Sequence, residues 1–141
     1  MKKQSAVSVL FVVGALYDGL LGIAFLFAAG EVFRILEVTP PNHPGYVQFP
    51  AALLIVFALM FLAIAKDPIA NRNLILYGIL LKVSYCSVVF FHWLTAGIPY
   101  MWKPFAICDL VFLALFAWAY STLAKTPQER ESAKEKIRAV S

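Results

Sequence analysis

The sequence predicts an all-α integral membrane protein built as a four-helix bundle. The 141 residues are 62% hydrophobic and 14% charged, whereas a soluble domain carries roughly a quarter charged residues. Four apolar runs approach the length of about 20 residues that a helix needs to cross a bilayer. A single soluble core cannot enclose this much apolar surface in so short a chain. The bilayer is therefore the predicted solvent.

The predicted spans cover residues 6–29, 48–65, 73–94 and 104–124. The opening "MKKQSAVSVLF" resembles a secretory signal, but the apolar run continues past Asp18 to about Ala29, which favours a spanning helix. The second span is the shortest, and we expect its ends to extend into the flanking loops. Residues 1–124 then form one transmembrane domain, and residues 125–141 form a charged cytoplasmic tail.

Two short helices are expected outside the spans. After the first span, "GEVFRILEV" mixes apolar and charged residues in a pattern typical of a helix that lies in the membrane interface, and "TPPNHPG" ends it. After the fourth span, "TPQERESAKEKIRAV" predicts a short cytoplasmic helix, because its start has the residues of a helix cap.

The distribution of Lys and Arg predicts the orientation. Nine of these residues lie outside the spans on the side of both termini, and two, Arg34 and Lys103, lie on the other side. Cytoplasmic loops carry the excess of positive charge, so we expect both termini in the cytoplasm and the chain in the cell (inner) membrane. The basic residues form no aromatic-studded patch, which argues against a nucleic-acid partner.

Three charged residues lie inside spans: Asp18, Lys82 and Asp109. Each costs about 2.5–3.5 kcal/mol at a helix centre, so we expect them to pair or to be neutralised. At 1.5 Å per residue, the two aspartates lie at a similar depth, roughly 20 Å from the cytoplasmic edge, and Lys82 lies roughly 13–14 Å from it. The lysine stem spans most of that difference, so Lys82 is expected to meet Asp18, Asp109 or both.

The helical phase supports an inward position for these charges. Gly14, Ala15 and Gly22 share the helix face of Asp18, and small residues mark close helix contacts. On the third span one stripe holds Lys82, Tyr85, Val89 and His92. The hydroxyls of Tyr85 and Tyr17 are expected to donate to the carboxylates. The predicted polar centre contains Asp18, Lys82, Asp109, Tyr85, His92 and Tyr17.

One lysine facing two aspartates leaves a net charge of −1. Either one aspartate holds a proton or a cationic His92 compensates, and we favour a protonated or His92-coupled Asp109. Three interpretations of the centre stay open: a structural network that fixes helix packing, a polar anchor for the head group of a ligand, and proton coupling in transport.

The sequence lacks the patterns of known catalytic chemistry. It has no Gly-rich phosphate loop, nucleophile elbow or zinc spacing, and Cys86 and Cys108 form no Cys-x-x-Cys pair. His43 lies in a turn, and we interpret it as an exposed loop residue. We therefore expect no catalytic residues, no metal site and no cofactor, although a bound lipid or quinone is compatible with the spans.

The span architecture resembles the DoxX-like group of small bacterial membrane proteins. The resemblance covers residues 6–124 and includes "YDGLLG" in the first span and the lysine-bearing "LLKVSY" in the third. "FPAALLIVFALMFLAIAKDP" and "FHW" also look like motif blocks. The resemblance implies a four-helix bundle, in some members linked to redox or thiol-stress complexes. It carries over no catalytic residue.

The leading functional hypothesis is a non-catalytic membrane protein that binds an amphipathic or lipid-like small molecule, or that serves as a subunit of a membrane complex. The alternative is an oligomeric proton-coupled transporter or channel. A quinone- or metal-using component of a membrane oxidoreductase comes third. The expected partners are the lipid bilayer, further copies of the chain or a larger complex, and an amphipathic small molecule.

Overall fold

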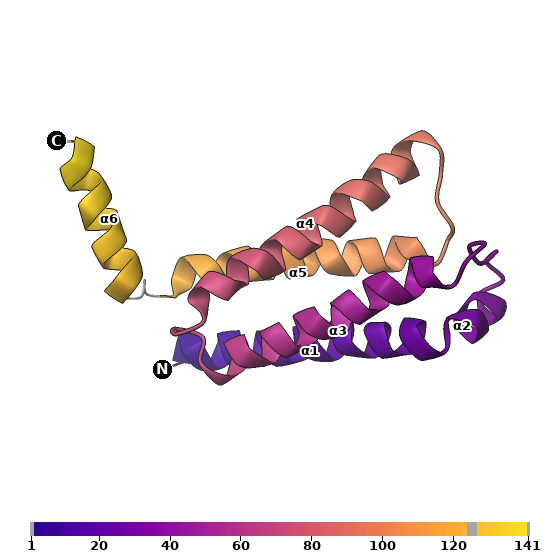
Figure 1. Ribbon diagram of the computed structural model, residues 1–141, viewed down its shortest axis with the longest axis horizontal. Coiled ribbons are helices and arrows are strands. Elements are labelled where there is room, and N and C mark those ends of the chain that lie inside the picture. The colour runs from indigo at the N-terminus through magenta and orange to yellow at the C-terminus, as the bar shows by residue number, and fades with distance from the viewer. Residues whose placement is uncertain (1, 124–126, 141) are drawn as a thin grey trace.

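The computed structural model describes residues 2–123 and 127–140, and all its regular elements in these ranges are α-helices. Four are long: α1 (Lys2–Phe27), α3 (Gly45–Lys66), α4 (Arg72–Thr95) and α5 (Trp102–Thr122). Each is long and apolar enough to cross a membrane, which indicates a multi-pass membrane protein and confirms the prediction of an all-α chain with four helices of spanning length. The second span is longer than its apolar run, as expected. The short helices are α2 (Ala29–Ile35) and α6 (Pro127–Val140) (Figure 1).

The four long helices form two antiparallel pairs. Helix α1 packs closely on α3, and α4 packs on α5, whereas far fewer contacts join one pair to the other (Figure 1). We call the end of the bundle at Lys3, Lys66 and Thr122 the terminal end, and the end at α2 and the α4–α5 connection the loop end. The two ends differ in how the space between the pairs is filled.

Near the terminal end, three phenylalanine rings fill the space between the pairs. Phe11 of α1, Phe61 of α3 and Phe116 of α5 are fully buried. The ring centroids lie 4.5 Å apart for Phe11 and Phe116, 5.1 Å for Phe61 and Phe116, and 5.6 Å for Phe11 and Phe61. Aromatic rings at these separations attract one another beyond simple packing. This three-ring core joins both helix pairs.

Glycines give the rings their room. A Cβ atom on Gly78 of α4 would lie 2.8 Å from Phe61 Cε1, and one on Gly14 of α1 would lie 3.2 Å from Phe116 Cζ. About two turns further along α1, a Cβ on Gly22 would lie 2.8 Å from the carbonyl oxygen of Ala51 in α3. The close contact predicted at Gly22 is therefore confirmed, and the backbones of α1 and α3 meet there.

Arg72 begins α4 and was counted among the cations outside the spans, but its side chain is turned into the bundle and is only 5% exposed. Its Nε and Nη2 atoms donate to the carbonyl oxygen of Tyr120 at 3.1 and 2.9 Å. Its guanidinium lies 3.8 Å from the centroid of the Tyr120 ring. A cation at the last carbonyls of a helix is favourable, so Arg72 fastens α4 to the end of α5.

At the loop end, α2 is anchored by one side chain. Phe33 is buried against Phe25 of α1, with ring centroids 6.0 Å apart, while Glu31 and Arg34 form an exposed ion pair at 2.6 Å. Helix α4 diverges from the other spans toward this end (Figure 1). The last turns of α4 therefore lie apart from the other spans, and the side chain of Leu94 is 83% exposed. The loop end is thus less tightly closed than the terminal end.

Candidate functional site

A buried cluster of three charged side chains joins three helices. Lys82 Nζ of α4 lies 2.7 and 2.9 Å from the two carboxylate oxygens of Asp18 in α1, and 2.9 Å from Oδ1 of Asp109 in α5. Lys82 and Asp18 are 1% exposed and Asp109 is 6% exposed. The structure thus brings Lys82 to both aspartates and ties α4 and α5 to α1.

Aromatic rings complete the surroundings of the ammonium group. Lys82 Nζ lies 5.3 Å from the ring centroid of Tyr17 and 5.5 Å from that of Phe112. Rings at this distance attract a cation, the more so where water is excluded. Its three hydrogen bonds go to carboxylate oxygens, two of Asp18 and one of Asp109. The ammonium is thus surrounded by two acids and two aromatic rings at this depth.

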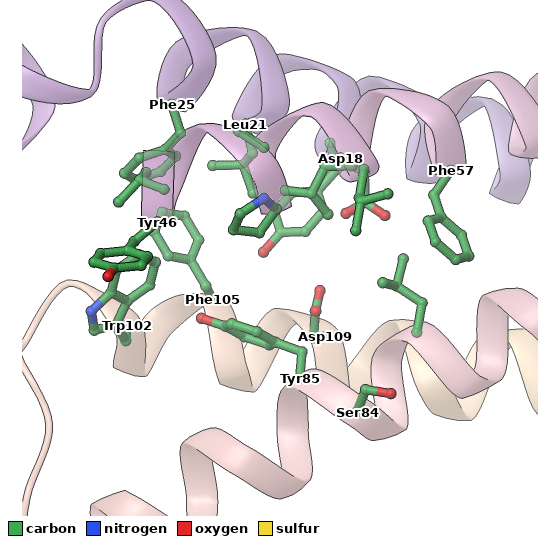
Figure 2. Close-up of a pocket in the computed structure, with 17 residues that line it drawn as sticks. Asp18, Leu21, Phe25, Tyr46, Phe57, Ser84, Tyr85, Trp102, Phe105 and Asp109 are labelled. Atoms are coloured by element: carbon green, nitrogen blue, oxygen red, sulfur yellow. The ribbon is translucent and has the colours of Figure 1, made fainter. Parts of the chain in front are cut away.

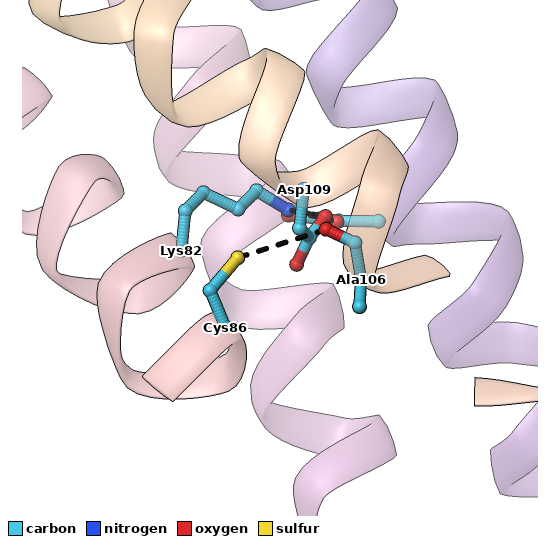
Figure 3. Close-up of polar contacts among 5 residues, drawn as sticks. Lys82, Cys86, Ala106 and Asp109 are labelled. Atoms are coloured by element: carbon cyan, nitrogen blue, oxygen red, sulfur yellow. Dashed lines mark hydrogen bonds and ion pairs between the residues drawn. The ribbon is translucent and has the colours of Figure 1, made fainter. Parts of the chain in front are cut away.

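One helical turn beyond the lysine, Cys86 makes a second contact between α4 and α5. Its Sγ lies 3.8 Å from the carbonyl oxygen of Ala106, one turn before Asp109 (Figure 3). Both Cys86 and Ala106 are buried. Free cysteine in such a place acts as a small hydrophobic residue with a weak donor. This contact holds the two helices together beside the cluster.

A cavity of about 430 Å³ opens between the helix pairs on the loop-end side of the cluster. Its lining includes the polar side chains of Asp18, Asp109, Tyr85 and Ser84 (Figure 2), together with Tyr17. Its walls are apolar and aromatic, with Phe25, Phe57 and Phe105 among them, and Tyr46 and Trp102 lie toward the loop end (Figure 2). A concave, mostly apolar space with a few convergent polar groups is typical of small-molecule sites.

The two tyrosines lie where the sequence placed them, but their hydroxyls do not donate to the aspartates. The oxygen atoms of Tyr17 and Tyr85 are buried, and neither has a hydrogen-bond partner among the described residues. Both side chains line the cavity instead. A buried hydroxyl without a partner costs free energy, so these two groups are available to a molecule that enters.

His92 does not join the cluster. Its side chain is exposed and packs against the ring of Phe91, with ring centroids 5.3 Å apart. The helical stripe that contains it is present, since Lys82 and Val89 are buried. Helix α4 diverges from the bundle before it reaches His92, however, so a shared helix face does not bring this residue to Asp109. The expected coupling of His92 to Asp109 is therefore wrong.

The cavity and most of its walls were not predicted from the sequence. Trp102 lies just before the predicted fourth span, and Phe25, Phe57 and Phe105 look like ordinary span residues. The available signal was indirect: Phe25 and Phe105 lie within two turns of the buried acids of their own spans, and Phe57 lies on a third span. Whether such residues fill a space or border it depends on the distance between helices.

Metal binding has no evident place in the described part of the chain. It contains no group of three or more His, Cys, Asp or Glu side chains placed to hold a metal ion. His43 lies in the loop before α3, where its Nδ1 accepts a hydrogen bond from the backbone N–H of Gly45 at 3.0 Å.

Comparison of the chain with protein-family models, with curated proteins and with solved structures gives no match. The similarity to DoxX-like proteins therefore stays a prediction from the sequence. What the fold and the site define is a class: a small multi-pass membrane protein with a buried ion cluster beside an apolar cavity. The geometry of the site carries the functional argument.

Proposed function

We propose that the protein binds an amphipathic small molecule in the cavity between its helix pairs and that it is not a catalyst. The observation that carries the proposal is the arrangement of the cavity. Its walls are mostly apolar, two buried aspartates and two tyrosines also line it, and its volume is about 430 Å³, which suits a small ligand. A molecule with an apolar body and one polar head matches this division.

The terminal half of the bundle favours binding over transport through a single copy. The three-ring core of Phe11, Phe61 and Phe116 lies between the charged cluster and the terminal end, and all three rings are fully buried. A molecule in the cavity therefore meets packed side chains beyond the acids. Passage would require the separation of rings whose centroids lie about 5 Å apart, whereas binding requires no such movement.

Filling the cavity tests the proposal. We expect Leu54→Trp, which places a large ring in the cavity, to remove a bound amphipathic molecule from the purified protein. Val56→Trp is the matched control, because Val56 lies on the same helix but is 58% exposed and does not line the cavity. The measurement is mass spectrometry of solvent extracts of both variants and the wild type, normalised to protein.

The expected result is one amphipathic species, near one per chain, in the wild type and in Val56→Trp, and its loss in Leu54→Trp. The same species in equal amount in all three proteins would contradict the proposal, because the cavity would then not be its binding site. Absence of any such species from the wild type, with no gain when candidate lipids are added, would also contradict it.

We further propose that the protein lies in the cell membrane with both termini in the cytoplasm. The support is the excess of Lys and Arg at the terminal end over the loop end, where Arg34 and Lys103 stand alone among such residues. Alkaline phosphatase, which is active only outside the cytoplasm, should be inactive when fused after Ser141 and active when inserted after Gly97. The reverse pattern would exclude this orientation.

A further inference from the structure

The cavity is bordered by the acids of the cluster and not by its cation. Asp18 and Asp109 both line it, whereas Lys82 does not (Figure 2). The lysine side chain reaches the carboxylates from α4 and is only 1% exposed. A molecule in the cavity therefore meets carboxylate oxygens and is separated from the ammonium by them.

The hydrogen bonds leave one carboxylate oxygen open. Lys82 binds both oxygens of Asp18 but only Oδ1 of Asp109. Among the described residues, Oδ2 of Asp109 makes no hydrogen bond. A cation in the cavity would favour the ionised form of Asp109. An ionised carboxylate only accepts hydrogen bonds, so Asp109 then offers an acceptor and a negative charge that the single lysine does not balance.

Two hydroxyls stand beside this acceptor. Tyr17 on α1 and Tyr85 on α4 both line the cavity, and their oxygen atoms are buried without a partner among the described residues. Figure 2 shows Tyr85 and Asp109 directed toward the same space. A phenolic oxygen accepts as well as donates. The open oxygen and the two hydroxyls together form a site for a group with several N–H donors.

We infer that the cavity selects cationic amphiphiles: molecules that place an ammonium group at Asp109, Tyr17 and Tyr85 and an apolar body against the aromatic walls. This inference rests on the proposed function and names its ligand class. An ammonium donates to the open oxygen and to the tyrosines, and its charge brings the cluster from −1 to zero. Charge-assisted hydrogen bonds of this kind are the stronger ones.

Other head groups fit this site less well. A carboxylate head would add a third negative charge next to Asp18 and Asp109, and like charges at close range repel strongly in a low dielectric. An alcohol head donates one hydrogen bond and leaves the charge of the cluster unbalanced. The same apolar tail should therefore bind with an affinity that depends on its head.

A matched series of probes tests this dependence: decylammonium, decanol and decanoate, which share one tail. The protein is placed in phosphatidylcholine nanodiscs, with Trp93→Phe and Trp118→Phe leaving the cavity residue Trp102 as its only tryptophan. Binding is read from Trp102 fluorescence after correction for partition into empty nanodiscs. We expect decylammonium to bind at least about 10-fold more tightly than either of the others.

Two substitutions at the site and one control outside it locate the effect. Asp109→Asn should remove most of the preference for decylammonium and keep the Lys82–Asp18 pair, whereas Asp67→Asn makes the same charge change in the α3–α4 turn, outside the cavity, and should leave the preference intact. Tyr85→Phe removes one hydroxyl and no charge, and we expect it to weaken decylammonium binding about threefold or more. This variant tests the site even if Asp109→Asn does not fold.

The outcomes separate the two proposals. If decanol or decanoate binds as tightly as decylammonium, or the preference survives both Asp109→Asn and Tyr85→Phe, the cavity binds amphiphiles but the inferred ligand class is wrong. If none of the three probes changes Trp102 fluorescence while the protein remains folded, the inference is overturned. The mass spectrometry of the Leu54→Trp and Val56→Trp variants then decides whether the cavity binds any amphiphile.

Discussion

Toward the terminal end, Phe11, Phe61 and Phe116 fill the space between the helix pairs, whereas toward the loop end Phe25 and Phe105 border a cavity. Both halves use the same kind of side chain on the same helices. The first three rings are fully buried and touch one another. In the other half, α4 diverges (Figure 1), and its side chains Leu81, Ser84 and Tyr85 border the cavity without filling it.

The difference between the halves lies in helix separation more than in residue type. Gly78 lets α4 approach the ring of Phe61 near the terminal end, and Arg72 fastens the same helix to α5. Beyond Lys82, the described polar contacts between α4 and α5 are the weak one between Cys86 and Ala106 and, at the far end of the two helices, the approach of Lys103 Nζ to within 5.1 Å of the ring centroid of Trp93. The charged cluster thus lies at the boundary, where the packed half ends and the hollow half begins.

Removing the cation should break this arrangement most severely. We expect Lys82→Met to lower the free energy of unfolding by about 3–5 kcal/mol, because two buried carboxyl groups would lose their shared partner. Since the cluster ties α1 to α4 and α5, both halves should loosen together. The measurement is unfolding of the detergent-solubilised protein, followed by its helical signal.

Lys66→Met serves as the control, because Lys66 ends α3 with an exposed side chain. It removes the same charge and inserts the same side chain without touching the cluster, and its effect should stay within about 0.5 kcal/mol. If the two variants unfold alike, the cluster does not hold the halves together. The cavity would then need another explanation for its fixed shape.

The spans were predictable because their signal is local. Length and apolar composition identify each span without reference to its neighbours, and the turn at α2 follows from "TPPNHPG". The burial of Arg72 was not predictable from the same signals, since a basic residue at a span end usually faces water or head groups. Its position depends on Tyr120, which lies 48 residues further along the chain.

For the site, charge and depth carried the prediction part of the way. Asp18, Lys82 and Asp109 are costly in a membrane wherever they lie, so partners were expected, and the structure places the three within hydrogen-bond distance. Helical phase alone also assigned His92 to the cluster, but it says nothing of where a helix diverges. The cavity depends on that divergence, so sequence periodicity did not indicate it.

The comparison between the halves becomes quantitative with one substitution in each. Phe116→Ala should lower the free energy of unfolding by on the order of 3 kcal/mol, because it leaves a void where three rings meet. Phe105→Ala should cost about 1 kcal/mol or less, because its ring already borders an open space and loses fewer contacts. Both are phenylalanines of α5, so helix and residue type are matched.

Ligand binding should separate these two variants in the opposite order. Phe105→Ala enlarges the cavity and removes part of its aromatic wall, so it should change the affinity for decylammonium. Phe116 does not line the cavity, so folded Phe116→Ala should bind decylammonium as the wild type does. Equal losses of stability in the two variants would mean that the loop-end half is as tightly packed as the terminal half. The cavity would then be closed in the native protein. The contrast between the halves, on which both functional proposals depend, would disappear.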